Sequence, residues 1–416
     1  RQAIRFDAEC VAIADPAAAK ALQADIAAAY KSNRREAASE LVAERQALKD
    51  ELAALDASLA EHLAARAAAL AAIPNLVDTE VPAELTVVRS LVASRDSGYL
   101  APTDLHRHHV LLHMIGGADF ARGAKVAGSR GYFLCGPGLA LNRALASYGL
   151  AFLAERGFAA LAPPLMMADD MLTRAGQLGP AAEAALFTLS NRQSLIPSAE
   201  QPLAALHAGE LLDADLLPLR YAGFSQCFRA EASERSASGL YRVHVFDKVE
   251  QFVIAASQSD ARAELDSMVD IALEFYASLE LSTRLVAMPT ADLSHAAALK
   301  FDIEAEFAAA PESAPDRWGE LVSASSCTDY QARALDVRTV PSRNHVHMIN
   351  ATLVATHRTL CALLEAWQTP TGISVPPVLA PYLIPPFAGS AELPFVHLPF
   401  DPVGAPPSSL PVGSLQ

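Results

Sequence analysis

Two neighbouring stretches of the sequence decide the fold: Cys227-Phe228-Arg229-Ala230-Glu231 and Gly239-Leu240-Tyr241-Arg242-Val243-His244-Val245-Phe246-Asp247-Lys248-Val249-Glu250. In both stretches apolar residues alternate with charged or polar ones, which is the period of a β-strand. We therefore predict strands over residues 219–228 and 240–254, joined by a polar connection over 230–239.

The charged residues of these two strands are predicted to share faces. Arg229 and Glu231 are two residues apart, and so are successive members of the set Phe246, Lys248 and Glu250. Burying such charges in a central hairpin is costly unless they meet a polar ligand. Because guanidinium groups bind phosphate and carboxylate through paired hydrogen bonds, the pattern indicates an anion-binding site. A ladder of salt bridges within the sheet is the alternative.

A second polar set lies near residue 350. Asn350-Ala351-Thr352 ends a predicted strand over 346–352, and Arg358 follows in the first turns of a predicted helix over 353–368. A cation at the start of a helix beside polar strand residues is a candidate ligand contact, although a surface arginine is the alternative.

Two further segments are candidate binding sites. Residues 320–333 combine small hydroxyl residues with acids, including Glu320 and Ser323, which suits a site beside phosphate or hydroxyl groups; a polar loop is the alternative. Ser198-Ala199-Glu200 is a weaker signal of the same kind. The sequence contains no GxxxxGK[ST], GxGxxG or HExxH motif, so it lacks the usual signals for a P-loop, a dinucleotide fold or a zinc protease.

Composition restricts the classes of protein that remain. The chain has 416 residues, 52% of them hydrophobic, which suggests two or three domains with a sizeable core. Its net charge of −15 argues against nucleic-acid binding over the whole surface but not against a local basic patch. Five scattered cysteines without a CxxC pair favour a reducing compartment and make a cysteine zinc site improbable. No membrane span is expected.

The N-terminal region differs from the rest. Residues 16–72 contain 23 alanines and no glycine, and leucines recur there at helical spacing, namely Leu41, Leu48, Leu52, Leu55, Leu59 and Leu63. This narrow seam is typical of a coiled coil, with the basic segment 31–35 as the tip of an antiparallel hairpin; an ordinary solvated helix is the alternative. Folded in two, the segment gives helices of about 25 residues, near 40 Å long. Because the chain begins at Arg1, a preceding targeting segment is a further expectation.

The rest of the chain favours an α+β fold with an antiparallel sheet, since its predicted strands and helices do not alternate regularly. Prolines 74 and 82 predict an extended linker after the helical region. The proline-rich tail from residue 394 onward is predicted to be extended or disordered.

These segments, taken in order, resemble the seryl-tRNA synthetase family of class II aminoacyl-tRNA synthetases. The hairpin resembles motif 2, Asn350 to Arg358 resembles motif 3, and residues 157–164 resemble motif 1. Gly128 to Leu134, Ser198-Ala199-Glu200, Asp302 to Ala305 and Ser325 to Arg333 resemble other family segments. The Asn-Ala-Thr form, the Phe-Asp-Ile-Glu-Ala string and the proline-rich tail look most like the animal mitochondrial branch.

The resemblance implies the reaction and the site. Serine and ATP would give seryl-adenylate, and the serine would pass to tRNA-Ser, with Mg²⁺ as cofactor and no zinc. It implies three catalytic residues, Arg229, Glu231 and Arg358. The same three residues would bind ATP together with Phe246, Glu320 and Ser323. Glu320 and Ser323 would also hold the magnesium ion that accompanies ATP. For serine it implies Ser198, Glu200, Arg229, Glu250, Asn350 and Thr352.

The resemblance also implies an organisation. Residues 1–76 would be a tRNA-binding helical arm, with Lys31, Arg34 and Arg35 as tRNA contacts. Residues 77–394 would be the catalytic domain and 395–416 the tail. A homodimer in the mitochondrial matrix would follow, with the cytoplasm as the alternative compartment.

The sequence departs from the family pattern in several places. The arm and the loop between Glu231 and Gly239 look short, and that loop ends in Ser238 where arginine is common. Other unusual residues are Val245, Glu306, Ser326, Ala334 and His357. These departures leave a second hypothesis open, a non-catalytic relative that acts as a binding or dimer-partner subunit. The retained Arg229, Glu231, Glu250 and Arg358 favour the active enzyme.

Overall fold

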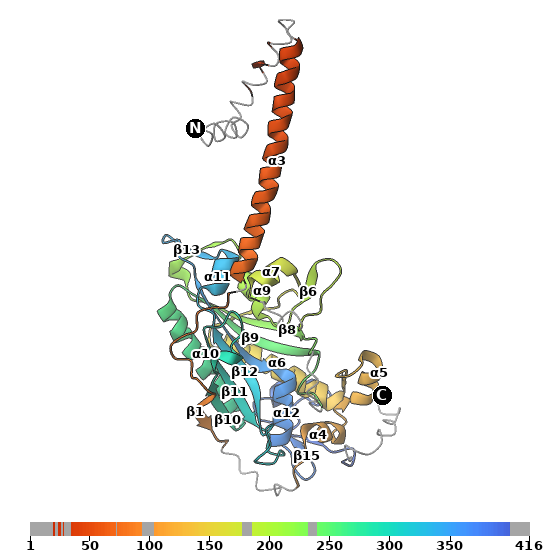
Figure 1. The fold of residues 1–416 in the computed structure, drawn as a ribbon. Helices are drawn as coiled ribbons and strands as arrows, with labels where there is room; N and C mark the ends of the chain where they lie inside the picture. Colours follow the sequence, from red (N-terminus) through yellow and green to blue (C-terminus); the bar gives the residue numbers. More distant parts are fainter. Residues whose placement is uncertain are drawn as a thin grey trace. The chain divides into compact units, whose positions relative to one another are not determined.

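The computed structural model describes residues 20, 24, 25, 28, 35–71, 73–93, 104–176, 185–231 and 239–399 (Figure 1). The chain divides into two compact units, Arg1–Ile73 and Pro74–Gln416. The prolines at positions 74 and 82 stand where the long helix has ended, as the sequence predicts.

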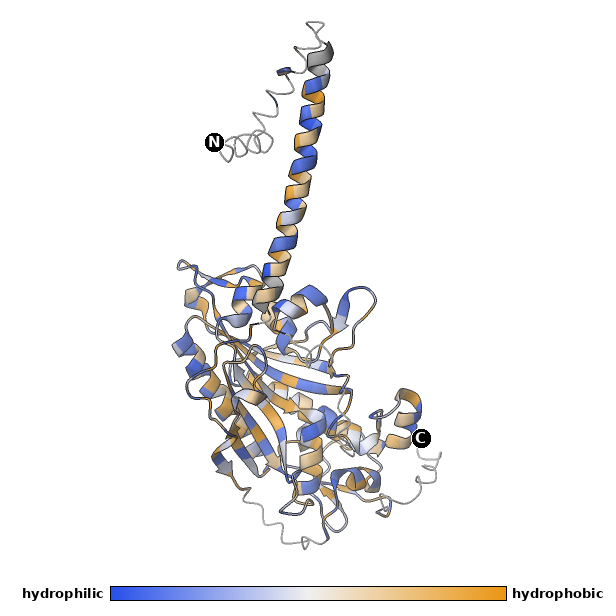
Figure 2. Cartoon of the chain, viewed as in Figure 1, coloured by the Kyte–Doolittle hydropathy of each residue, from blue (hydrophilic) through white to orange (hydrophobic). Residues whose placement is uncertain are grey.

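The first unit contains one long described helix, α3 (Arg35–Ala71). At 37 residues it is longer than the predicted 25, because no glycine or proline interrupts it before Pro74. Polar and apolar residues are mixed along its length (Figure 2). In the leucine seam, Leu55, Leu59 and Leu63 are exposed, whereas Leu41, Leu48 and Leu52 are half-buried. Lys31 and Arg34 lie outside the described residues, and so does most of the predicted partner helix; Arg35 begins α3.

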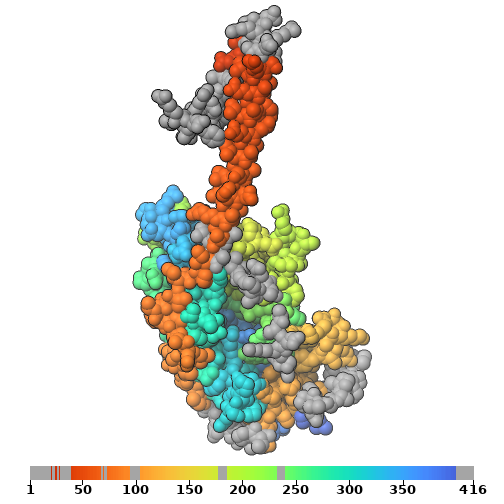
Figure 3. All heavy atoms as spheres, viewed as in Figure 1, coloured from red at the N-terminus to blue at the C-terminus, as the bar shows by residue number. Residues whose placement is uncertain are grey.

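The second unit is built on an eight-stranded sheet in the order β1-β10-β11-β12-β14-β9-β8-β4. All neighbours pair antiparallel except β4 and β8, which are parallel. Segments far apart in the sequence therefore share one surface, as β1 and β10 do (Figure 3). The strands are β1 (Thr86–Leu91), β4 (Ala159–Leu161), β8 (Leu219–Phe228), β9 (Val245–Ala255), β10 (Thr283–Ala287), β11 (Leu299–Glu306), β12 (Trp318–Ser326) and β14 (His347–Ala355).

Helices cover the two faces of this sheet differently. The long helices α6 (Gly136–Ala154) and α10 (Gln258–Ser278) pack on the face that carries Gln251, whose Nε2 donates to the Met268 carbonyl at 3.2 Å. The short helices α7 (Asp169–Arg174), α9 (Glu200–Ala205) and α11 (Tyr330–Leu335) form a smaller apolar cluster with Phe252 and Ile254 (Figure 1). The α+β class with an antiparallel-rich sheet is confirmed.

Shorter elements complete the unit. The helices are α4 (His108–Met114), α5 (Phe120–Ala127) and α12 (Thr356–Ala366). Four two-stranded pairs join β2 (Ala118–Asp119) with β3 (Phe133–Leu134), β5 (Met166–Ala168) with β6 (Gln193–Leu195), β7 (Leu211–Asp213) with β13 (Arg338–Val340), and β15 (Gly372–Ser374) with β16 (Glu392–Pro394).

Two predicted boundaries and one predicted shared face around the hairpin and motif 3 are wrong. The second hairpin strand begins at Val245 rather than Leu240. Leu240 and Val243 lie in the turn before the strand, and because their side chains are buried, the sequence there alternates as it would in a strand. Glu231 lies beyond β8 with φ +47°, so the period-2 argument does not place it on a face with Arg229. The helix expected from residue 353 begins at Thr356, since β14 continues pairing with β9 as far as Ala355.

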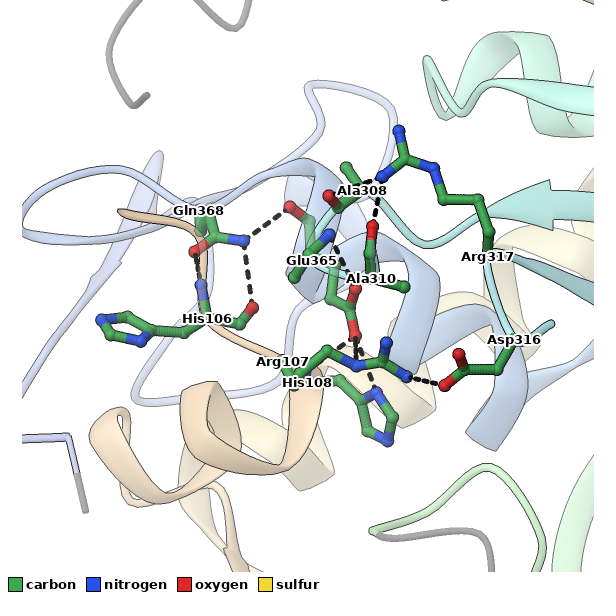
Figure 4. A network of polar contacts seen from close by, with 10 residues as sticks. His106, Arg107, His108, Ala308, Ala310, Asp316, Arg317, Glu365 and Gln368 are labelled. Carbon is green, nitrogen blue, oxygen red and sulfur yellow. Dashed lines mark hydrogen bonds and ion pairs between the residues drawn. The ribbon is translucent and has the colours of Figure 1, made fainter. Parts of the chain in front are cut away.

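A buried carboxylate ties α12 to the segment before α4 (Figure 4). Glu365 Oε1 accepts from His108 Nδ1 at 2.9 Å and from the His108 backbone N–H at 3.0 Å, and Arg107 Nε lies 3.4 Å away. Gln368 extends the network by accepting from the His106 backbone N–H at 2.9 Å. Because Glu365 is only 1% exposed, these charge-assisted bonds compensate the cost of burying it.

The chain after β16 is only partly described. The backbone N–H groups of Val396 and His397 both donate to the Met114 carbonyl, at 2.7 and 3.0 Å, so the start of the predicted tail is bound to the end of α4. Residues 400–416 lie outside the described part. Among the helices that are described, none is long and apolar enough to cross a membrane.

Candidate active site

The predicted site residues gather on the sheet face opposite α6 and α10. On β9, Phe246, Lys248 and Glu250 alternate as predicted, and all three are buried. Thr352 of β14 pairs with Glu250, and Asn350 lies two residues before it on the same strand. Neighbouring strands therefore bring residues that are about 100 positions apart in sequence into one polar row.

The centre of the row is a buried cluster around Lys248. Its Nζ lies 2.7 Å from Ser198 Oγ and 3.5 Å from Thr352 Oγ1, and it forms a short ion pair with Glu250. Thr352 Oγ1 also lies 3.3 Å from Glu250 Oε2. Because each of the four side chains is at most 7% exposed, a small polar ligand here would meet preorganised partners rather than water.

A glycine in β8 lets α9 approach this cluster. Gly223 pairs with Glu250 across the hairpin. A Cβ at Gly223 would come within 2.7 Å of Leu203 Cδ1 and 3.0 Å of the Ala199 Cβ. The absence of a side chain therefore allows Ser198, which precedes α9, to reach Lys248.

Glu200 supplies a second carboxylate beside the cluster. Its Oε1 accepts from Gln331 Nε2 at 3.0 Å, and its backbone N–H donates to Ser198 Oγ at 3.1 Å. Burial raises the pKa of Glu200 to about 7, and the Glu250 carboxylate adds to this; Lys248 opposes the shift. A carboxylate held in this state gains most from a cationic partner.

An aromatic and cationic set lies along the same strand. The Arg229 guanidinium carbon lies 5.4 Å from the centroid of the Phe246 ring, and Arg229 Nε donates to the Pro197 carbonyl at 3.3 Å. Behind Phe246, the His357 ring centroid is 4.1 Å away with the planes at 34°. A flat apolar ring beside a guanidinium suits a planar anionic ligand such as a nucleotide.

Arg358 forms the far edge of this set. Arg358 forms an ion pair with Glu320. Its Nη1 donates to Glu320 Oε1 at 2.9 Å and to the Glu320 carbonyl at 3.1 Å. The Tyr241 hydroxyl donates to the same carbonyl at 3.1 Å, and the Arg358 guanidinium lies 5.0 Å from the Tyr241 ring centroid. Arg358 is thus in the first turn of α12, as predicted, and is not a surface residue.

A β-bulge aligns the two predicted magnesium ligands. Asp302 pairs with Ser323, and Glu304 pairs with Glu320. Asp302 and Glu304 are two apart and share a face, so Glu320 and Ser323 share that face although they are three apart. The polar-loop alternative for this segment is wrong, because β12 and α11 account for most of it.

Glu231 is the one predicted catalytic residue that is already engaged by cations. Its Oε2 lies 3.1 Å from Arg242 Nη1 and 3.8 Å from Arg130 Nη1. The loop that follows it, including Ser238, lies outside the described residues. Of the salt bridges within the sheet that the alternative predicts, the Lys248–Glu250 pair on β9 is present, whereas the ion pairs of Glu231 lie outside the sheet strands.

Sequence reasoning left three residues of the site without a role. Lys248 stands at the centre of the cluster, Gln331 binds Glu200, and Tyr241 binds the Glu320 carbonyl. Lys248 was detectable, since it shares a strand face with Glu250. The other two reach the site through tertiary packing of α11 and of the turn after the hairpin loop, which no local pattern encodes.

Comparison with known proteins now identifies the family. Residues 187–367 match the tRNA synthetase class II core domain (G, H, P, S and T). A cytoplasmic serine–tRNA ligase of Arabidopsis thaliana is 41% identical over 345 residues, which are 79% of this chain and 74% of that protein. The chain belongs to the seryl-tRNA synthetase family. It is an ATP-dependent serine–tRNA ligase of class II, and the hypothesis of a non-catalytic relative is not favoured.

Solved structures of the family agree. A seryl-tRNA synthetase from Pyrococcus horikoshii, complexed with ATP, has a TM-score of 0.75 and 31% identity, and the match covers 95% of this chain and 93% of that one. A cytoplasmic serine–tRNA ligase from Naegleria fowleri, in complex with AMP, has a TM-score of 0.74 and 34% identity over 82% of this chain and 73% of that one. The expected likeness to the animal mitochondrial branch is not supported, because two of the three relatives named here are cytoplasmic.

Proposed function

We propose that the polar sheet face carries out both steps of the ligase reaction, serine activation and transfer to tRNA-Ser. The proposal rests on two sets of side chains that lie next to each other on this face of the sheet. A buried cluster of acids and hydroxyls around Lys248 lies beside the aromatic and cationic set of Arg229, Phe246 and Arg358. The first suits a small amino acid with a hydroxyl, and the second suits a nucleotide.

Serine would bind in the cluster around Lys248. Glu200 and Glu250 would hold its ammonium group, while Ser198, Asn350 and Thr352 would surround its hydroxyl. Lys248 would keep Glu250 and Ser198 in place through the contacts described above. A pocket built for a hydroxyl rejects an analogue without one by roughly 10⁴–10⁵, because its buried partners go unpaired, and this would exclude alanine.

ATP would lie along Phe246. Its adenine would stack on that ring, Glu231 would accept from the adenine amino group after giving up part of its pairing with Arg242, and Arg358 would bind the γ-phosphate. Arg229 would contact both the serine carboxylate and the α-phosphate. The carboxylate oxygen attacks the α-phosphorus, the bond to the β-phosphate oxygen breaks, and pyrophosphate leaves. Arg229 would stabilise the charge that builds up on phosphorus.

The second step uses the same groups. The terminal ribose hydroxyl of tRNA-Ser attacks the carbonyl carbon of seryl-adenylate, the bond to the phosphate oxygen breaks, and AMP leaves. No side-chain nucleophile is needed, so the protein contributes positioning and electrostatic stabilisation.

Magnesium fits the residues at the bulge. Glu320 and Ser323 present a carboxylate and a hydroxyl on one face, and the Oδ1 atom of neighbouring Asp302 is buried without a hydrogen-bond partner in the described part of the chain. Within the described ranges, no group of three or more His, Cys, Asp or Glu could hold a metal ion by itself. Mg²⁺ commonly binds one or two protein carboxylates together with substrate phosphates, and it would here balance phosphate charge.

Assembly and tRNA binding extend the proposal. The helical arm would bind tRNA-Ser through Lys31, Arg34 and Arg35, and α3 would be one of the two helices of its coiled coil. Two chains would form a homodimer, which is supported by exposed apolar side chains between β3 and β5, namely Phe133, Leu139, Leu165 and Met166. A cytoplasmic location is supported by the two relatives above.

Serine-dependent ATP–pyrophosphate exchange tests the chemistry. We expect Arg229→Ala to reduce exchange by at least 10³-fold, because it removes the cation beside the reacting phosphate. Arg89→Ala is the matched control, since the Arg89 side chain is 52% exposed and forms an ion pair with Asp270 on the surface. Exchange near wild type in Arg229→Ala would show that the site assignment is wrong.

A further inference from the structure

His357 is a buried residue at the nucleotide face for which the proposed chemistry has no use. It is the second residue of α12 and is 3% exposed. Its Nδ1 atom is buried without a hydrogen-bond partner among the residues that the structure describes. An apolar side chain would avoid the cost of burying that nitrogen. A small or apolar residue would therefore be expected here if the position served packing alone.

The start of α12 is fastened to the nucleotide strands at three successive positions. Thr356 Oγ1 donates to the Asp247 carbonyl at 3.0 Å, and Arg358 binds Glu320. Between them, the His357 ring lies against Phe246 with centroids 4.1 Å apart. The three contacts join the elements that would hold the adenine and the γ-phosphate, and His357 touches the adenine end.

We propose that His357 is a positioning residue for ATP, whose imidazole packs on one face of Phe246 and holds that ring so that adenine stacks on the other. The proposal rests on the role proposed above for Phe246. A phenyl ring without a partner on its rear face can tilt, and an aromatic neighbour at this separation restricts it.

The charge of the side chain explains why histidine suits this position better than lysine or arginine. Burial lowers the pKa of His357 well below its ordinary value, and Arg358, Arg229 and Lys248 lower it further. The ring is therefore neutral and adds no repulsion among the cations that face the phosphates. It supplies a flat surface that lysine or arginine could supply only with a charge.

The test compares ring and non-ring variants in serine-dependent exchange, with ATP and serine titrated separately. His357→Ala and His357→Leu should raise the KM for ATP roughly 2- to 10-fold, the size of an aromatic pair contribution, and leave the KM for serine unchanged. His357→Phe retains the ring and should stay within about twofold of wild type. In a Phe246→Ala background, His357→Ala should have little further effect, because the two residues act as a unit.

Each result decides between explanations. An unchanged KM for ATP in His357→Ala, with Phe246→Ala impaired, would overturn the positioning role and leave the proposed function intact. A Phe246→Ala variant with normal KM for ATP would overturn adenine stacking itself. If His357→Ala is insoluble, the comparison of Leu with Phe replaces it, and equal KM values for those two variants refute the role. Equal loss of serine and ATP binding together with a lower melting temperature would show a merely structural residue.

Discussion

At the scale of single residues, the site depends on carboxylates whose surroundings differ. Glu250 is held by Lys248 and Thr352, whereas Glu200 is half-buried and accepts a hydrogen bond from Gln331. Burial raises the pKa of Glu200 to about 7, so its charge changes within the range in which the enzyme can be assayed. Two neighbouring acids with different environments can therefore play different parts in binding the serine ammonium.

We expect serine binding to weaken as the pH falls below about 7. Protonation of Glu200 removes a negative partner of the ammonium, so the KM for serine should rise, approaching about tenfold per pH unit well below the pKa. Measurements of the KM for serine between pH 6 and 8.5 check this, with the KM for ATP as an internal control. Glu200→Gln should bind serine more weakly and lose the slope; a slope that persists would assign the titration to another group.

At the scale of elements, the approach of α9 to β8 shapes the serine pocket. There is no room for a Cβ at Gly223, because the side chains of Leu203 and Ala199 lie directly against the backbone of β8 there. This contact places Ser198 within reach of Lys248 and Glu250. The bulge in β12 acts similarly, because it shifts the register by one residue and so places Glu320 on the site face together with Ser323.

Gly223→Ala should raise the KM for serine at least tenfold. The added methyl pushes α9 outward, and small displacements of positioning residues are costly in catalysis. The matched control is Gly149→Ala, whose Cβ would meet Val354 at 2.9 Å on the opposite face of the sheet. The control should lower the melting temperature, at a cost of about 1–3 kcal/mol, without a specific effect on serine. Identical kinetic effects of the two substitutions would argue against a local role of Gly223.

At the scale of the whole molecule, an acidic protein must bind a polyanion. The net charge is −15, so a general attraction to tRNA is excluded and a local basic surface is required. The tip proposed at Lys31, Arg34 and Arg35 would be such a surface, and the catalytic face adds Arg229 and Arg358. The two functions are therefore expected to be separable.

Reversal of charge at the tip should separate them. Lys31→Glu, Arg34→Glu and Arg35→Glu combined should leave serine-dependent exchange unchanged and raise the KM for tRNA-Ser in aminoacylation at least tenfold. The dependence of tRNA binding on salt should become shallower by roughly 0.7 to 0.9 in logarithmic slope for each lost phosphate contact. Arg89→Glu, on the surface of β1, serves as the control. Unchanged aminoacylation would place the tRNA contact elsewhere.

The sequence by itself determined what local patterns can encode. Alternation predicted β8 at its observed bounds and the shared face of Phe246, Lys248 and Glu250. The alanine-rich, glycine-free segment predicted helical structure where α3 lies, although as one half of a hairpin with helices of about 25 residues, and Arg358 was expected in the first turns of a helix. These features depend on side-chain period and on backbone preference, which neighbouring residues fix together.

Only the tertiary structure decided which distant residues meet. Glu320 and Ser323 share a face through a bulge that no local pattern reveals, and Lys248 meets Ser198 because Gly223 admits α9. The stacking of His357 on Phe246 likewise depends on where α12 begins after β14. Such contacts are set by the registers of paired strands and by the packing of helices on them, and these are properties of the assembled sheet rather than of any single segment.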